Sequence, residues 1–217
     1  MRKVIVLEFM SLDGVVQAPS YADEDRSGGF AHGGWHRQYL EERAMKWVVD
    51  TVSSAGGFLF GRRTYEVFAA HWPQASPEEQ VLAQPLNTRP KYVASRTLKA
   101  PLAWQGSTLL DDPVVESVAT LRVQDGGNLV VVGSPQLAAA LLAHDLVDEL
   151  RLMIDPVILG GGKRFFGDDG ACRRLALASS EATPTGATLA TYLRSRSDAP
   201  AAAGAPSLPR PPREPGS

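Results

Sequence analysis

The chain has 217 residues, with 22 basic and 24 acidic side chains and a formal net charge of −2. This balance offers no basic surface for a nucleic acid or an anionic membrane. The single cysteine, Cys172, excludes an internal disulfide framework and multi-cysteine metal sites.

Glycine and proline are abundant, and the prolines gather at the end of the chain. There are 20 glycines and 16 prolines, and 6 of the prolines lie within residues 198–217. We therefore expect a folded domain over residues 1–195 and a disordered Pro/Ala-rich tail over residues 196–217. The P-x-x-P spacing in the tail leaves open a role in binding a partner protein. No apolar stretch approaches the length of a membrane span or a signal peptide core, so we expect a cytoplasmic protein without a membrane partner.

The first half of the chain begins with an apolar, β-branched run at residues 4–9, which predicts a buried strand. A polar, glycine-rich segment follows at 17–35, and a loop of that length in a small domain is typically functional or disordered. Apolar residues at helical spacing predict a helix from residue 36 to residue 55, ended by Gly56 and Gly57.

Strands and helices then alternate along the chain, which favours an α/β fold with a mostly parallel sheet flanked by helices. Residues 182–185 and 188–193 resemble an antiparallel C-terminal hairpin around Gly186. The other predicted strands are 58–60, 91–94, 129–132, 149–154 and 157–159, and the other predicted helices are 64–68, 111–123 and a helix from 135.

Two glycines each stand between a predicted strand and a predicted helix. A helix start offers free N–H groups and a positive dipole end, and both suit a phosphate. Two arginines follow the first of these glycines, and their guanidinium groups add paired N–H donors that suit a phosphate. A glycine before a helix is also common without any ligand, so a purely structural role stays open for each position. The residues are Gly61, Arg62, Arg63 and Thr64 at the first position, and Gly133, Ser134, Pro135, Gln136 and Leu137 at the second.

A third candidate is Ser95-Arg96-Thr97, which follows the predicted strand at 91–94. One cation and two hydroxyls suit a terminal phosphate, such as the extra phosphate that distinguishes NADPH from NADH. The alternative is an exposed turn.

Taken together, these motifs resemble the dihydrofolate-reductase-like superfamily. The resemblance is nearer to the reductase domain of the bacterial riboflavin-biosynthesis deaminase-reductase and to its stand-alone relatives, and it covers roughly residues 3–194. The strings that carry it are MSLDG at 10–14, FGRRTYE at 60–66, PKYV with SRT at 90–97, LVDEL at 146–150 and PVILGGGKRFF at 156–166. The zinc-binding motifs of the deaminase half are absent from the sequence, so that activity is not expected.

The resemblance implies an enzyme that uses NADPH, with phosphates at the helix starts after Gly61 and Gly133 and the adenosine phosphate near Ser95 and Arg96. Hydride would pass to a C=N or C=O bond of a small pterin- or pyrimidine-like substrate, which would sit under the 17–35 loop. The resemblance also implies a homodimer. The alternative is a non-catalytic nucleotide- or flavin-binding module of the same fold.

The proton donor is open between Asp13 and Glu41. Asp13 lies at the end of the first strand, where it faces the substrate or forms a turn with Gly14. Glu41 lies on the predicted first helix, where it engages the substrate or points into solvent.

The resemblance makes Ser11, Trp35 and Lys163 candidates for substrate binding. The alternatives for Trp35 and Lys163 are packing and an exposed turn. The four histidines show no metal-like pattern, so we expect no metal site.

Overall fold

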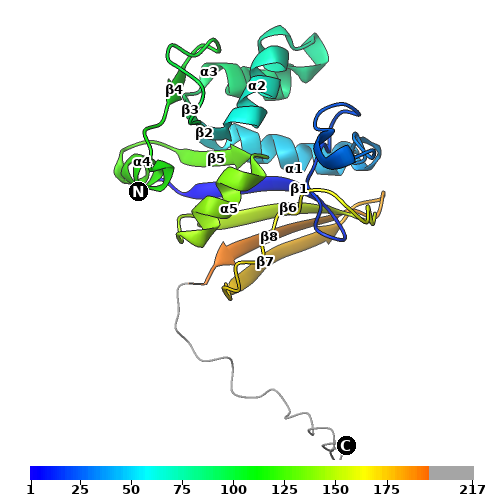
Figure 1. The fold of residues 1–217 in the computed structure, drawn as a ribbon. Helices are drawn as coiled ribbons and strands as arrows, with labels where there is room; N and C mark the ends of the chain where they lie inside the picture. The colour runs from blue at the N-terminus through cyan, green and yellow to red at the C-terminus, as the bar shows by residue number, and fades with distance from the viewer. Residues whose placement is uncertain (196–217) are drawn as a thin grey trace, which may run out of the picture.

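Consecutive β-branched and aliphatic residues near the start of the chain form β1 (Val4–Ser11), an inner strand of an eight-stranded sheet (Figure 1). The computed structural model describes residues 1–195. The strand order is β4-β3-β2-β5-β1-β6-β8-β7; the first six strands are parallel, and β8 runs antiparallel to both β6 and β7. The expected α/β class with an antiparallel C-terminal end is therefore confirmed. The other strands are β2 (Ala55–Gly61), β3 (Lys91–Ala94), β4 (Ser107–Leu109), β5 (Asn128–Val132), β6 (Glu149–Asp155), β7 (Leu175–Ala182) and β8 (Thr188–Arg194).

Helices cover both faces of the parallel part of the sheet. Side chains alternate between the two faces of a strand, so Val4 and Val6 pack with α4 and α5, while Ile5 and Leu7 pack with α1, α2 and α3. Burial on both faces explains why β1 and β5 are nearly continuous apolar runs. The helices are α1 (Glu42–Ser53), α2 (Arg62–His71), α3 (Gln80–Thr88), α4 (Val114–Val123) and α5 (Pro135–Ala143).

The first helix begins six residues later than the sequence pattern predicts. Its N-terminal cap is Glu41, whose carboxylate accepts hydrogen bonds from the backbone N–H groups of Arg43 and Ala44 at 3.0 and 2.8 Å. The expected start at His36 is wrong because the His36 side chain is buried against Asp155, at the end of β6. That contact fixes the backbone before the helix in a short 3-10 turn at Arg37–Tyr39.

Gly56 and Gly57 were expected to end this helix, but they lie inside β2. A side chain on Gly56 would place its Cβ 2.6 Å from the Cα of Gly127, so the glycine allows two backbone segments to meet.

Other parts of the predicted pattern also differ from the structure. Helix α3 and strand β4 were not predicted, and residues 157–159 are outside the strands. The terminal hairpin is longer than expected, because its first strand is Leu175–Ala182.

In the described part of the chain, no helix combines the length and apolar character needed to cross a bilayer. The expected tail at 196–217, with its P-x-x-P motif, lies outside the described residues.

Candidate functional site

The ends of β2 and β5 lie side by side at the carboxyl edge of the sheet, and one hydrogen bond joins them. The backbone N–H of Gly61 donates to the Ser134 hydroxyl at 2.9 Å. Gly61 directly precedes α2, and Ser134 directly precedes α5. Gly133 and Ser134 both have a positive φ, of 60° and 56°, which turns the chain sharply from strand to helix. The structure therefore brings two helix N-termini together at neighbouring strand ends.

A cleft of about 610 Å³ opens over these two helix starts. Gln17, Asp25, Lys163 and Arg164 form part of its opposite wall. Helix N-termini and arginines give this cleft the donors and the positive charge that an anionic ligand requires. The predicted cofactor residues that line it are Gly61, Arg62, Arg63, Thr64, Ser134, Pro135, Gln136 and Leu137.

The two arginines of the cleft have different partners. Arg62 donates to Glu66, one turn along α2, at 2.9 Å. Arg63 lies 3.4 Å from Asp25 in the 17–35 loop. Arg62 is thus held on its own helix, while Arg63 reaches across the cleft.

The third predicted phosphate position lies apart from the cleft, in a hollow of about 180 Å³ beyond the end of β3. The Ser95 hydroxyl accepts hydrogen bonds from the N–H groups of Thr97 and Leu98, so it caps its own turn. The Arg96 side chain is 86% exposed and lies 3.4 Å from Asp112. Ser95 and Arg96 line the hollow, and Thr97 does not belong to its lining.

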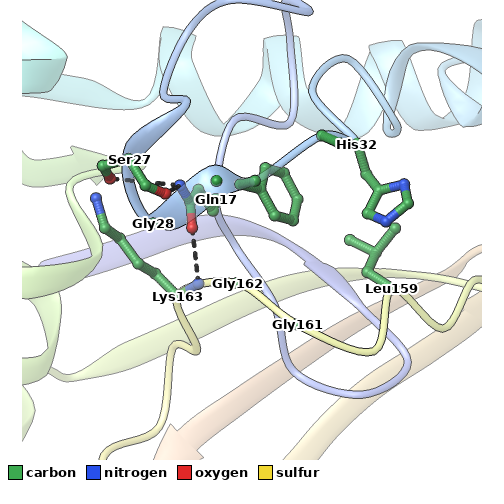
Figure 2. Close-up of a pocket in the computed structure, with 11 residues that line it drawn as sticks. Gln17, Ser27, Gly28, His32, Leu159, Gly161, Gly162 and Lys163 are labelled. Atoms are coloured by element: carbon green, nitrogen blue, oxygen red, sulfur yellow. Dashed lines mark hydrogen bonds between the residues drawn. The ribbon is translucent and has the colours of Figure 1, made fainter.

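The Gln17 side chain holds the 17–35 loop, and Figure 2 shows its hydrogen bonds to Ser27 and Lys163. The Gln17 side-chain amide donates to the carbonyls of Asp25 and Ser27 at 2.9 and 3.0 Å, and its oxygen accepts from the N–H of Lys163 at 3.0 Å. The indole N–H of Trp35 donates to the Gln17 carbonyl at 2.9 Å. Trp35 is only 6% exposed and packs with Val15, Ala18 and Phe30. It does not line the second pocket, of about 430 Å³, which the 17–35 loop forms with the turn at 159–163.

Lys163, in the segment after β6, forms an ion pair with Asp25 of the 17–35 loop. Its ammonium lies 2.5 Å from the Asp25 carboxylate. Burial opposes the ionisation of Asp25, but the hydrogen bonds from Lys163 and Ser27 outweigh it and lower the pKa of Asp25 to about 2. The carboxylate is therefore charged at neutral pH and is shared between Lys163 and Arg63.

Asp13 joins the end of β1 to the glycine-rich turn that follows β6. Its carboxylate accepts hydrogen bonds from the Ser11 hydroxyl at 2.7 Å and from the N–H groups of Leu159 and Gly160 at 3.1 and 3.0 Å. The Ser11 hydrogen bond is the main cause that lowers the pKa of Asp13. Asp13, Ser11 and Glu41 are not among the residues that line the cleft or the apolar cavity described next.

An apolar cavity of about 360 Å³, which the sequence did not predict, adjoins the cleft and is covered by α1, α2 and α3. Its apolar wall includes Phe9, Val48, Phe68, Leu82 and Val132. A cavity of this kind, with a few polar side chains at its rim, suits a flat organic ring. Of the described residues, only Glu24 and Val67 line both the cleft and the apolar cavity.

Glu24 was not singled out from the sequence. One of its carboxylate oxygens accepts hydrogen bonds from the N–H groups of Ser20 and Tyr21 at 2.8 and 3.2 Å. Burial is the largest influence on its pKa and raises it, while these two hydrogen bonds act in the opposite direction.

Two further acids are buried near Glu24. Glu8 in β1 is 2% exposed, one of its oxygens has no hydrogen-bond partner, and burial raises its pKa to about 8. Asp155 lies 2.7 Å from Nδ1 of His36, and both side chains are fully buried. His36 also stacks on Phe9, with ring centroids 4.0 Å apart. Burial raises the pKa of Asp155, and the His36 hydrogen bond partly counteracts this.

In residues 1–195, no cluster of three His, Cys, Asp or Glu side chains is arranged to hold a metal ion.

The mostly parallel eight-stranded sheet with its antiparallel end and flanking helices has the dihydrofolate-reductase-like fold. The family model described as the RibD C-terminal domain matches residues 2–189, and the chain belongs to that family.

The chain is similar to a bacterial relative in sequence. It is 30% identical over 121 residues to the uncharacterized protein YyaP of Bacillus subtilis (strain 168). The match covers 55% of this chain and 63% of YyaP, so it spans less than two thirds of that relative.

Two solved structures share the fold. A candidate riboflavin biosynthesis protein from Shewanella sp. PV-4 has a TM-score of 0.68 at 21% identity, covering 89% of this chain and 99% of that one. A dihydrofolate reductase from Enterococcus faecalis, solved in complex with NADP(H), has a TM-score of 0.57 at 14% identity and covers 88% of this chain and 96% of that one.

Proposed function

We propose that the chain is an NADPH-dependent reductase that transfers a hydride to a C=N or C=O bond of a small pterin- or pyrimidine-like substrate. The observation that carries this proposal is the Gly61–Ser134 hydrogen bond, because it places two helix N-termini on one cleft beside an apolar cavity. Membership of the RibD C-terminal domain family and the likeness to a dihydrofolate reductase support it.

The residues of the cleft fit a dinucleotide phosphate. The two helix starts supply backbone N–H donors, and Arg63 and Lys163 supply positive charge once a phosphate competes with Asp25 for them. Ser95 and Arg96 lie in the hollow beyond β3, where they would select NADPH over NADH by its extra phosphate. When bound, NADPH supplies the hydride; this chain supplies orientation and exclusion of water.

The test is a titration with NADPH followed by nicotinamide fluorescence, then a search for NADPH oxidation with a panel of pterins and ribosylamino-pyrimidines. We expect binding well below millimolar and oxidation with at least one member of the panel. Arg63→Ala should weaken binding, and Arg89→Ala, an exposed arginine at the end of α3, serves as the charge-matched control. Binding without turnover would instead favour the non-catalytic nucleotide-binding module.

A further inference from the structure

Glu24 stands where the cleft and the apolar cavity meet. It is the one titratable residue, among those the structure describes, that lines both. If the cofactor occupies the cleft and the substrate ring occupies the apolar cavity, the junction is where the reacting atoms meet. A carboxyl group at that point lies within reach of the substrate.

The hydrogen bonding of Glu24 leaves one oxygen for a ligand. The N–H groups of Ser20 and Tyr21 both donate to Oε2, which fixes the side chain in one orientation. Oε1 has no partner among the hydrogen bonds of the described residues. The carboxyl is therefore positioned by the backbone through one oxygen, and its other oxygen is available.

The surroundings of Glu24 favour its protonated form more than water does. The group is half-buried, and desolvation is the largest influence on its pKa. Asp25 raises its pKa and His36 lowers it, and Glu8 lies close enough for the charge of Glu24 to raise the pKa of Glu8. Arg37, His71, Glu78 and Glu79 line the apolar cavity. Arg62, Arg63, Lys163 and Arg164 line the cleft, where Arg62 pairs with Glu66 and the single charge of Asp25 is shared between Arg63 and Lys163.

The other acids near the site either line neither cavity or have their carboxylates engaged elsewhere. Glu8 keeps one oxygen without a partner, but it does not line the cleft or the apolar cavity. Glu78 and Glu79 line the apolar cavity only, and backbone hydrogen bonds lower the pKa of each. Asp13 accepts from two backbone N–H groups and from Ser11, Glu41 caps α1, and Asp25 binds Lys163. Asp155 is sealed against His36 with no exposed surface.

We propose that Glu24 is the acid that protonates the substrate as it accepts the hydride. This inference rests on the proposed function and adds the group that completes the reaction. When bound, NADPH would supply the hydride to the carbon of the C=N or C=O bond, and the π electron pair of that bond would pass to the nitrogen or oxygen. The O–H bond of Glu24 breaks, and its proton forms the new N–H or O–H bond. The substrate is reduced by two electrons, NADPH is oxidised to NADP⁺, and water in the cleft returns a proton to the Glu24 carboxylate.

The test compares Glu24→Gln with the wild type in the full chain. The substituted amide retains a carbonyl oxygen that can accept from Ser20 and Tyr21, so the loop should keep its shape, but an amide is not an acid. We expect kcat to fall about 10²-fold or more, because a positioned general acid typically contributes 10²–10⁴-fold. NADPH binding should not weaken. Asp23→Asn, an exposed neighbour in the same loop, is the matched control and should keep its activity.

The pH profile separates an acid from a structural residue. Because only protonated Glu24 donates, kcat/KM of the wild type should fall as pH rises through the pKa of Glu24, and Glu24→Gln should lose this limb. In ¹³C-carboxyl NMR of the labelled protein, the Glu24 resonance should titrate above the ordinary glutamate value of about 4.3.

The outcomes distinguish this inference from the proposed function. If the wild type oxidises no NADPH with any member of the panel, the reductase function itself fails, and the inference with it. If the wild type turns over but Glu24→Gln matches Asp23→Asn in rate and pH profile, Glu24 is not the donor and the reductase function stands. An ordinary or lowered pKa in the NMR titration, or loss of NADPH binding in Glu24→Gln, also overturns the inference.

Discussion

The backbone N–H of Gly61 donates to the hydroxyl of Ser134 across 2.9 Å, although 73 positions separate the two residues in the chain. Parallel neighbours β2 and β5 end at the same edge of the sheet, so the turns that follow them meet there. The hydroxyl satisfies an N–H at the start of α2 and leaves the next donors of both helices to face the cleft. The geometry of the candidate cofactor site thus depends on one side chain.

Ser134→Ala should weaken both folding and cofactor binding. The variant leaves the Gly61 N–H without its partner, and an unsatisfied, partly buried donor typically costs about 1–3 kcal/mol. Misaligned helix starts should raise the Kd for NADPH by about tenfold, equivalent to ~1.4 kcal/mol. Urea unfolding and fluorescence titration measure the two effects. Ser180→Ala, at an exposed position of β7, should change neither; an unaltered Kd in Ser134→Ala would separate this bond from the cofactor site.

Asp25→Asn should loosen the 17–35 loop. The pKa of Asp25 is lowered to about 2, so its contribution is fully present above the ordinary aspartate value of about 3.9 and is lost as pH falls toward 2. At neutral pH the substitution removes the charge that holds Lys163 and Arg63. Ion pairs of this exposure are worth about 0.2–1 kcal/mol, so trypsin should cut after the exposed Arg26 about 1.4- to fivefold faster. Equal cleavage of Asp25→Asn and the control Asp23→Asn would show that other contacts hold the loop.

Glu8 should make the protein less stable as pH rises. Its pKa is about 8 in the folded chain and about 4.3 in an unfolded one, so the folded state holds a proton that the unfolded state has released between these values. Stability therefore falls with rising pH across this window. The stability of Glu8→Gln relative to the wild type should improve from pH 5 to pH 8 by on the order of a few kcal/mol, measured by urea unfolding. The free energy of unfolding of Asp125→Asn, an exposed control, should change with pH as that of the wild type does. If the free energy of unfolding of Glu8→Gln also changed with pH as that of the wild type does, Glu8 would be ionised in the folded protein.

Local patterns were sufficient to predict much of the fold. The strand at Lys91–Ala94 has the expected bounds, because Pro90 and the Ser-Arg-Thr turn bracket it. Strand β5 begins within one residue of its expected start, because its valine-rich run between turns has few alternatives. The meeting of Gly61 and Ser134 follows from parallel topology, which the alternation of strands and helices indicates. Helix α3 was missed because Pro85 lies inside it and its surroundings are polar.

The acids around the junction could not be placed from the sequence. His36 and Asp155 are 119 positions apart, and their pairing depends on how the 17–35 loop folds back on the sheet. Glu24 lies in that loop, whose shape is set by Gln17 and its long-range partner Lys163 and not by any periodic pattern. Glu8 did leave a signal, since it is a single acid inside an otherwise apolar strand. A carboxylate that interrupts a buried run indicates either a strand end or a group with a strongly shifted pKa.

Glu41 either only caps α1 or also donates a proton to the substrate, and one substitution distinguishes these two roles. Glu41→Ala removes the cap that binds the N–H groups of Arg43 and Ala44, and should cost about 1 kcal/mol of folding free energy. Glu41→Ser replaces the carboxylate by a hydroxyl that also caps well, so stability should be close to that of the wild type in urea unfolding. If capping is its whole role, turnover of NADPH in Glu41→Ser should also match the wild type. A stable Glu41→Ser with turnover reduced about 10²-fold would instead make Glu41 the proton donor in place of Glu24.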